Sequence, residues 1–180
     1  MKRALVVVDY QVDCVSGSIG FLDAKNLERK IQRKILTYKN GGDDVIFTFD
    51  THDEEYMGTK ESEHTPVRHC VKGTVGWNLY GLVEQTFGEK DKAFCKSTFG
   101  SMDLANYLRE NRYNSVEFVG IPSSICVLAN AVLAKSALPE SEIIIDASCT
   151  ASKDRVLNEE AFDIMEEMQM RVENRGVAME

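Results

Sequence analysis

The sequence lacks the features that mark membrane-spanning, secreted and nucleic-acid-binding proteins. Its first apolar segment, residues 4–10, is too short to cross a bilayer, and the N-terminus has no signal-peptide core. The five cysteines form no Cys-x-x-Cys pair, which argues against a disulfide framework or a zinc finger. A formal net charge of -8 disfavours nucleic acid and anionic membranes as partners. We therefore expect a cytoplasmic protein that binds neither nucleic acid nor membrane.

The sequence also lacks internal repeats and linkers, and apolar β-branched segments instead alternate with segments of helical periodicity. The expected strands are residues 4–10, 44–50, 92–96, 115–120, 142–147 and 170–174. The expected helices are residues 27–38, 77–87, 101–111, 125–137 and 154–168. Such alternation predicts an α/β fold with a mostly parallel sheet and helices on both faces. The length of 180 residues suits a single domain, residues 1–180.

Reactive side chains stand at or just beyond the ends of several predicted strands. Asp9, Asp50 and Lys96 lie at such ends, and Cys126 lies in the turn after strand 115–120. In open parallel sheets, binding sites form beyond the carboxyl ends of the strands. We therefore expect these side chains to share one edge of the sheet.

Cys126, Lys96 and Asp9 have the chemistry of a nucleophilic centre. A thiol near the first turn of a helix is biased towards the thiolate, and a nearby Lys96 would lower its pKa further. Asp9 would accept the thiol proton and deliver it to a leaving group, which suits attack on an amide carbon. From the residues alone, a packed thiol, a surface lysine and a turn-capping acid remain alternative interpretations.

All three histidines of the chain lie in one polar segment, residues 51–76. Asp50 and His52 are two residues apart, so on an extended segment they face the same way. Glu61, His64 and His69 follow. One carboxylate and two imidazoles, with a second carboxylate, suit zinc, iron or manganese. The alternative interpretation is a solvated acidic loop with incidental histidines.

A series of short motifs covers nearly the whole chain in one order: VVVDYQVD, DTH, RHCVKGT, KSTFGSMDL, GIPSSICVLANA and IIIDASCTAS. This series resembles the isochorismatase-like cysteine hydrolases, and within them the nicotinamidase (pyrazinamidase) branch. The resemblance implies a three-layer α-β-α, Rossmann-like fold with a six-stranded, mostly parallel sheet. It also implies an enzyme with a small-molecule amide substrate. Members of the family are often homo-oligomers, so we expect one here.

The resemblance maps the family's catalytic triad onto Asp9, Lys96 and Cys126. In nicotinamidases the cysteine attacks the carboxamide carbon of nicotinamide and ammonia leaves. Water then hydrolyses the thioester to nicotinate. The resemblance therefore implies that Asp9 is the base, Lys96 stabilises the thiolate and Cys126 is the nucleophile.

The resemblance also implies one divalent metal ion, with zinc as the first choice and iron or manganese as alternatives. Its expected ligands are Asp50, His52 and His69, with Glu61 preferred to His64 as the ligand that varies between family members. In those enzymes the metal holds the pyridine nitrogen and orients the ring. These ligands therefore favour an aromatic amide as substrate.

Some residues depart from the family pattern. Cys14 replaces a phenylalanine that often lines the ring pocket, which suggests a wider or different substrate. We expect Cys14, Tyr56 and Trp77 to line the pocket. Ser123 and Ser124 stand where family members usually have Thr-Asp. The alternatives to a nicotinamidase are an amidase for another carboxamide or a carbamoyl amide, and a catalytically silent member.

Pro122 is the third departure, and it lies in the turn that carries Cys126. In the family, the peptide bond that ends at this position is cis, and proline lowers the cost of that geometry. The backbone N–H at this position commonly joins that of the nucleophile in the oxyanion hole, but proline has no N–H. Loss of one such donor typically costs about 10²- to 10³-fold in rate. Either Ser123 or a water supplies the missing donor, or the enzyme is slow on simple amides, or Pro122 merely ends the strand.

Overall fold

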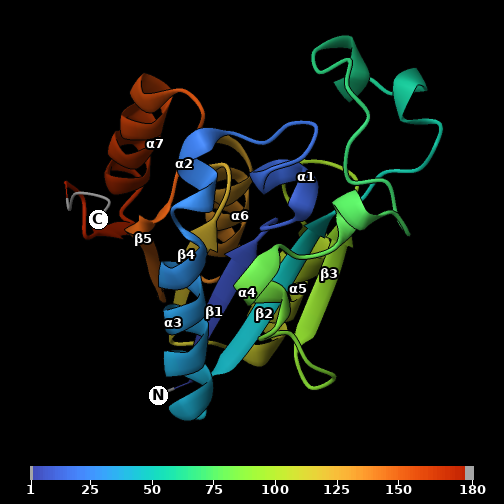
Figure 1. Cartoon of the computed structure of the whole chain (residues 1–180). Coiled ribbons are helices and arrows are strands. Elements are labelled where there is room, and N and C mark those ends of the chain that lie inside the picture. Colours follow the sequence, from blue (N-terminus) through green and yellow to red (C-terminus); the bar gives the residue numbers. More distant parts are fainter. Residues whose placement is uncertain (1, 177–180) are drawn as a thin grey trace.

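The computed structural model describes residues 2–176, which form a three-layer α-β-α arrangement (Figure 1). Within this range one sheet contains six strands: β1 (Arg3–Val8), β2 (Asp44–Asp50), β3 (Lys92–Lys96), β4 (Ser115–Gly120), β5 (Glu142–Thr150) and β6 (Arg171–Glu173). Every neighbouring pair is parallel, and the order across the sheet is β3-β2-β1-β4-β5-β6. The predicted fold is therefore confirmed, with a sheet that is parallel throughout the described range.

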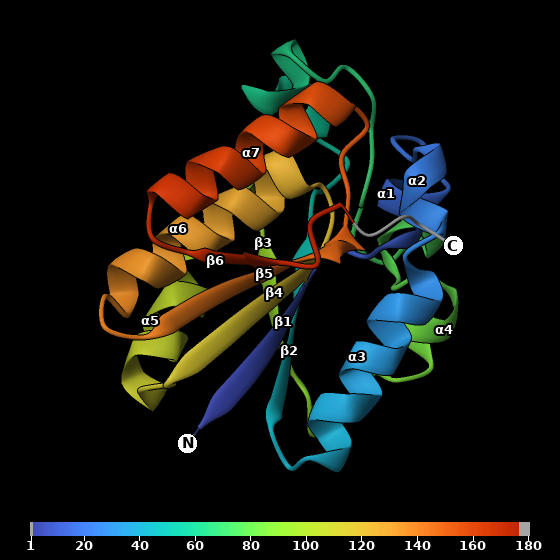
Figure 2. The same cartoon turned by 90° about the vertical axis from the view of Figure 1, so that its left-hand side faces the viewer.

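Helices cover both faces of this sheet. The α-helices are α1 (Val12–Val15), α2 (Leu22–Lys25), α3 (Glu28–Asn40), α4 (Gly81–Glu84), α5 (Met102–Asn111), α6 (Leu128–Ala137) and α7 (Arg155–Glu167). Shorter helical turns are η1 (Tyr56–Gly58), η2 (Glu61–Glu63), η3 (Val75–Trp77) and the π-type turn η4 (Ser123–Val127). Helices α5, α6 and α7 lie on one face of the sheet, and α3 and α4 lie on the other (Figure 2).

Strand β1 lies inside the sheet, and helices bury both of its faces. Val6 and Val8 pack in the cluster that includes α5, α6 and α7, whereas Leu5 and Val7 pack in the cluster that includes α3. Successive side chains of a strand point to opposite faces, so a strand that is buried on both sides is apolar without alternation. This explains why the start of the sequence is a continuous hydrophobic run.

The sheet has a topological switch point between β1 and β4. The chain builds β2 and β3 on one side of β1 and then returns to add β4 on the other. Ligands bind at such points in open α/β sheets. Gly120 ends β4 beside Val8 with a φ of 112°, and a Cβ atom there would lie 2.1 Å from the Val8 carbonyl oxygen. Only glycine therefore allows the two strands to approach this closely.

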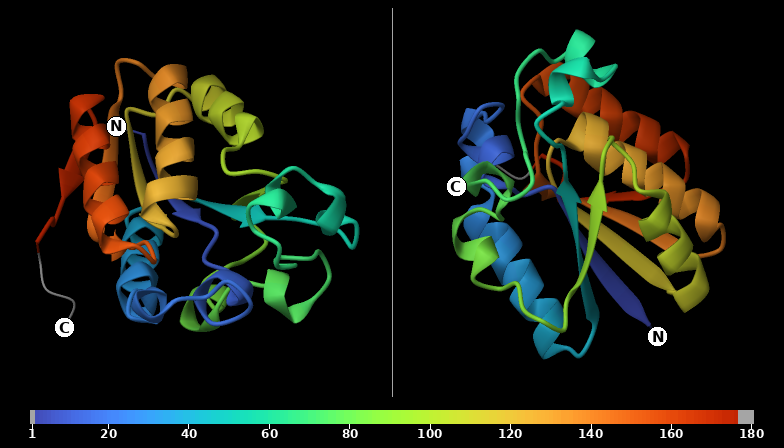
Figure 3. Two further views of the ribbon diagram at one scale, coloured as in Figure 1. Left: turned by 90° about the horizontal axis from the view of Figure 1, so that it is seen from above. Right: turned by 90° about the vertical axis from the view of Figure 1, so that its right-hand side faces the viewer.

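The polar segment of residues 51–76 extends beyond the carboxyl end of β2 (Figure 3). Its two ends are joined at the base, because His52 N–H donates to Cys70 O (3.0 Å) and Lys72 N–H donates to His52 O (2.9 Å). A long excursion without regular strands is thus closed by backbone pairing next to the sheet. This closure brings the later part of the segment back to the end of β2.

The prediction of a helix over residues 77–87 is wrong, because the α-helix found there contains only Gly81–Glu84. Gly81, the first residue of α4, has a φ of 51°, so the right-handed helix cannot continue back through it to residue 77, and Leu79 pairs with Gln11 in an isolated bridge. Long-range backbone pairing therefore outweighs local helical periodicity here.

Other boundaries differ by a few residues. The helix expected from residue 125 begins at Leu128, since Ser123–Val127 form the η4 turn. Strand β1 ends at Val8 rather than at residue 10, and β5 continues to Thr150. Among the described residues, no helix combines the length and apolarity needed to span a membrane. The cytoplasmic location and the single-domain extent stay predictions.

Gly120→Ala is expected to lower the free energy of unfolding by at least about 3 kcal/mol, because it combines an unfavourable φ with a backbone clash. Gly42→Ala is a matched control: its φ is 75°, but no atom lies within 4 Å of a Cβ placed there. We expect it to cost only about 1–2 kcal/mol. Urea unfolding followed by circular dichroism measures both changes. Equal losses in the two variants would contradict the close approach of β1 and β4.

Candidate active site

Asp9, Lys96 and Cys126 come together at the carboxyl edge of the sheet. Asp9 directly follows β1, Lys96 is the last residue of β3, and Cys126 lies in η4 after β4. Lys96 Nζ lies 2.6 Å from Asp9 Oδ2 and 3.8 Å from Cys126 Sγ. All three side chains are buried, with at most 8% of any residue exposed. The structure thus assembles residues that are 30 or more positions apart in the sequence.

The carboxylate of Asp9 is held in a defined orientation. Its backbone φ is 47°, a left-handed conformation that is uncommon outside glycine. Thr48 Oγ1 donates a 2.7 Å hydrogen bond to Asp9 Oδ1. Within residues 2–176, Asp9 Oδ2 has no aligned hydrogen-bond donor, although the Lys96 ammonium forms a close ion pair with it. Asp9 Oδ2 is therefore placed to accept a proton.

Burial determines the protonation state of the candidate nucleophile. Burial raises the pKa of the Cys126 thiol; the charge of Lys96 opposes this rise, and the charges of Asp9 and Asp50 add to it. Burial also raises the pKa of Asp9, again against the charge of Lys96. Lys96 therefore acts in the expected direction on the thiol pKa, but burial outweighs it. A thiol has to lose its proton before the sulfur can act as a nucleophile.

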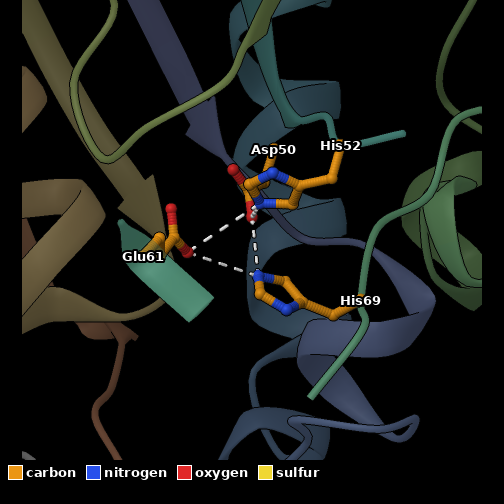
Figure 4. A group of neighbouring side chains, drawn as sticks. All are labelled: Asp50, His52, Glu61 and His69. Carbon is orange, nitrogen blue, oxygen red and sulfur yellow. Dashed lines mark hydrogen bonds and ion pairs between the residues drawn. The ribbon is translucent and has the colours of Figure 1, made fainter. Parts of the chain in front are cut away.

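A second group of polar side chains lies beside the first: Asp50, His52, Glu61 and His69 (Figure 4). One ligand atom from each lies within 4.8 Å of all the others. Asp50 Oδ2 is 3.2 Å from His52 Nε2 and 3.3 Å from His69 Nε2. Glu61 Oε1 is 3.8 Å and 3.5 Å from the same two nitrogens. His64 is exposed and lies outside this group, so the structure places Glu61 there instead.

The spacing of these four donor atoms fits a small divalent ion. Tetrahedral bonds of about 2.1 Å put neighbouring ligand atoms roughly 3.4 Å apart. The four carboxylate–imidazole contacts of the group lie between 3.2 and 3.8 Å. Imidazole and carboxylate donors suit zinc, iron and manganese. The residues present therefore fit one divalent metal ion.

The imidazoles of the metal-ligand group are fixed by neighbours outside it. His69 Nδ1 donates a 2.8 Å hydrogen bond to Val67 O, which leaves the Nε2 lone pair free to face the group. Tyr56 packs edge-on against both imidazoles, with ring centroids 4.6 Å from His52 and 4.9 Å from His69. Its hydroxyl donates to Thr65 O, and its side chain is fully buried. Tyr56 thus packs against both histidines, and its expected place in the substrate pocket stays a prediction.

Asp50 connects the two groups. Burial alone would raise its pKa, but the contacts with His52 and His69 and the charge of Lys96 hold that pKa below its ordinary value. Burial alone would lower the pKa of His69, but its contacts with Asp50 and the Val67 carbonyl raise it. Asp50 Oδ1 also lies 3.4 Å from Lys96 Nζ. One carboxylate therefore faces the imidazoles with one oxygen and the lysine with the other.

The chain matches the family model described as Isochorismatase domain over residues 3–175. The chain belongs to the isochorismatase domain family. An uncharacterized isochorismatase family protein of Bacillus subtilis (strain 168), PncA, is 33% identical over 144 residues, which cover 73% of this chain and 78% of that protein. The nicotinamidase/pyrazinamidase of Mycobacterium tuberculosis (strain ATCC 25618 / H37Rv) is 28% identical over 166 residues, which cover 84% and 89%.

Solved structures agree with this assignment. The crystal structure of nicotinamidase PncA from Bacillus subtilis has a TM-score of 0.83 at 25% identity and covers 96% of this chain and 99% of that chain. A pyrazinamidase of Pyrococcus horikoshii, solved in complex with zinc, has a TM-score of 0.84 at 23% identity and covers 96% and 98%. The family and the enzyme class predicted from the motifs are therefore confirmed.

Two further residues, Gln11 and Thr48, contact the candidate site residues of this isochorismatase family member. The search for reactive side chains at the carboxyl ends of strands does not find them. Gln11 Nε2 donates to Asp50 O (3.0 Å) and Trp77 O (2.8 Å), and Gln11 Oε1 accepts from Asp50 N–H (2.8 Å). Gln11 is fully buried. The sequence contained one signal that could have pointed to Gln11: it stands two residues after Asp9 in the VVVDYQVD motif. Its partners lie 39 and 66 positions away, however, and only the fold brings them together.

Cys14 and Trp77, the other expected pocket residues, have partners of their own. Cys14 Sγ lies 3.5 Å from Cys70 Sγ. Hydrogen bonding to Cys70, burial and the charges of Asp9 and Asp50 raise the pKa of Cys14. Trp77 Nε1 donates to Thr51 Oγ1 (2.9 Å), and its ring packs on Phe49 with centroids 4.9 Å apart. Direct contact of Cys14 or Trp77 with substrate stays a prediction.

The turn before the candidate nucleophile contains a cis Ile121–Pro122 bond, as the family resemblance implies. Ser123 N–H donates to Ala151 O at 3.0 Å, and Ser123 is fully buried. Ser123 N–H is therefore engaged and does not replace the donor missing at Pro122. Of the alternatives considered, the Ser123 N–H is thus not available, because Ala151, directly after β5, accepts it; a water donor and slow turnover of simple amides remain.

The purified protein is expected to bind one divalent ion per chain after incubation with zinc, manganese or iron salts, measured by inductively coupled plasma mass spectrometry. Glu61→Ala should weaken metal binding by more than about tenfold. Loss of a residue that only hydrogen-bonds to a metal ligand already weakens metal affinity by about that factor. His64→Ala is the matched control and should bind as wild type does. Absence of stoichiometric metal, or equal losses in both variants, would contradict the assignment.

Proposed function

We propose that the protein is a metal-dependent amidohydrolase that converts nicotinamide to nicotinate and ammonia through a cysteine thioester. The observation that carries this proposal is that Asp50 joins the two groups, with Lys96 at one oxygen and the two histidines at the other. A ring held beside the histidines would present its carboxamide to Cys126. Relatives named nicotinamidase support the choice of substrate.

Asp9 and Cys126 carry the proton transfers in this proposal. As Cys126 Sγ attacks the carboxamide carbon, its proton passes to Asp9 Oδ2 and a tetrahedral intermediate forms. Asp9 gives the proton to the amide nitrogen, the C–N bond breaks, and ammonia leaves a thioester behind. Water then loses a proton to Asp9 and attacks the thioester carbon. The C–S bond breaks, the carboxylic acid is released and the sulfur regains its proton.

Lys96 remains charged through this cycle. Burial alone would lower its pKa, but the charges of Asp9, Cys126 and Asp50 outweigh burial and hold the pKa well above its ordinary value. A fixed ammonium 3.8 Å from the sulfur stabilises the negative charge that develops there. Lys96 is therefore an electrostatic residue in this mechanism and not a proton donor.

Asp50, His52, Glu61 and His69 would hold the metal ion. When bound, the ion supplies a Lewis acid that takes the pyridine nitrogen and so orients the ring. Zinc is the first choice, and the zinc complex of a pyrazinamidase with the same fold supports it. Iron and manganese accept the same donors. The cytoplasmic location and a homo-oligomeric state remain part of the proposal.

A second candidate is hydrolysis of another carboxamide or of a carbamoyl amide. Pro122 offers no N–H to an oxyanion, and Cys14 has a small side chain where the family resemblance implies a phenylalanine. An N-carbamoylsarcosine amidase of Thermoplasma acidophilum shares the fold, with a TM-score of 0.79 at 21% identity. The buried assembly of base, ammonium and thiol disfavours a catalytically silent member.

Ammonia release from a panel of amides tests this choice. Wild type is expected to release ammonia from nicotinamide faster than from aliphatic carboxamides or N-carbamoyl amino acids. Cys126→Ala should lower kcat by at least about 10³-fold. Cys95→Ala, which changes an exposed thiol of β3, is the control and should leave kcat unchanged. Fast turnover of another amide, with none of nicotinamide, would replace the nicotinamidase proposal; no turnover at all would favour the silent member.

Thr48→Val is expected to move the acidic limb of the kcat/KM profile to higher pH. The Thr48 hydroxyl lowers the pKa of Asp9, which burial raises, so its removal raises that pKa further. The base must be deprotonated to act, and a higher pKa therefore costs activity at lower pH. Rates across the pH range for both proteins measure the shift. An unchanged acidic limb would show that Asp9 is not the titrating base.

A further inference from the structure

A chain of serine hydroxyls ties the turn that carries Cys126 to the end of β5 and to α7. Ser152 Oγ lies 2.7 Å from Ser123 Oγ and 2.8 Å from Ser124 Oγ. It also accepts a 2.9 Å hydrogen bond from Ser124 N–H. Ser123 Oγ in turn reaches Asn158 Oδ1 on α7. Ser123 and Ser152 are buried, with 0% and 4% of their surfaces exposed, so water does not compete for these bonds.

The direction of every hydrogen bond in this chain follows from its last member. Asn158 Nδ2 donates to Glu159 Oε1, so Asn158 Oδ1 faces Ser123 and can only accept. A hydroxyl has one proton, and that of Ser123 therefore goes to Asn158. Ser152 must then donate to Ser123, and Ser124 must donate to Ser152. Each of the three serine hydroxyl protons is therefore used in one defined hydrogen bond.

Ser152 is the central residue of this chain and the one that touches both serines of the turn. The turn is fixed at its other end by Asn130, whose Nδ2 donates to Cys126 O at 2.8 Å. Without the Ser152 hydroxyl, the N–H and the hydroxyl of Ser124 would lose this partner, and Ser123 Oγ would keep only its bond to Asn158; unpaired polar groups that are not fully exposed are costly. On the β5 side, the part of the turn between Pro122 and Cys126 would then keep only the hydrogen bond from Ser123 N–H to Ala151 O.

We propose that Ser152 is a positioning residue for the Cys126 nucleophile, acting through Ser123 and Ser124. The proposal rests on the function proposed above, in which the Cys126 proton passes to Asp9 Oδ2. That transfer requires the sulfur to stay against the carboxylate, and a misplacement of about 1 Å can cost on the order of 10²-fold in rate. The serines that replace the family's Thr-Asp pair thus have a defined role in this chain.

Ser152→Ala tests this role against Ser141→Ala. Ser141 precedes β5 at its opposite end and donates a 2.6 Å hydrogen bond to Tyr113 O, so its variant also loses one hydroxyl bond, far from the turn. Ser152→Ala is expected to lower kcat for the best amide by about 10- to 100-fold, with KM changed by less than about twofold, because the ring-binding residues are untouched. Ser141→Ala should leave both constants unchanged.

A second readout does not depend on the amide substrate. p-Nitrophenyl acetate acetylates Cys126, and mass spectrometry at short times follows this with Cys95 as the internal reference. Loss of positioning is expected to slow acetylation of Cys126 relative to Cys95 by about tenfold or more. A merely loosened fold would expose the thiol and speed its labelling, so the two explanations give opposite signs.

Wild-type kcat and Cys126 acetylation in Ser152→Ala would overturn the proposal, and so would faster acetylation. If wild type releases no ammonia from nicotinamide, the proposed function fails while the acetylation assay still decides the role of Ser152. If Ser152→Ala does not fold, Asn158→Ala replaces it, because it removes the last acceptor on α7 without altering the turn. The same directions of change are expected there, and unchanged rates would again overturn the proposal.

Discussion

The buried ion group of Lys96, Asp9 and Asp50 is the interaction on which the rest of the site depends. Taking an ammonium ion out of water costs several kcal/mol unless opposite charges compensate. Two carboxylates do so here, 2.6 and 3.4 Å from the lysine nitrogen. They stand at the ends of β1 and β2, and Lys96 pairs directly with Asp50 across β2 and β3. The group therefore forms only when three neighbouring parallel strands are in register.

The charges around this lysine explain why the adjacent group fits a metal ion. One ammonium between two carboxylates leaves an excess of negative charge, and Glu61 adds to it on the side of the histidines. A divalent cation bound among these carboxylates would offset that excess. Asp50 faces both groups. Binding of the ion and protonation of Asp9 and Cys126 are therefore electrostatically linked.

Burial imposes a further constraint on the chemistry. Burial raises the pKa of the Cys126 thiol, and the charges of Asp9 and Asp50 add to that rise. Transfer of the thiol proton to Asp9, and back again, keeps the net charge of the buried group constant through the proposed cycle. Such a transfer tolerates little movement of the sulfur. A rigid turn around Pro122, held by buried hydroxyls, is consistent with that requirement.

The sequence by itself determined the strands, their parallel arrangement and the meeting of Asp9 and Cys126 at one edge. A run of β-branched residues buried on both faces is a local signal, and the carboxyl ends of parallel strands always share an edge. Only the tertiary structure decided that Glu61, already preferred to His64, lies with the histidines, that residues 77–87 are not one helix, and that burial raises the pKa of the Cys126 thiol. These outcomes depend on loop closure, backbone pairing and burial between distant segments, and no local pattern encodes them.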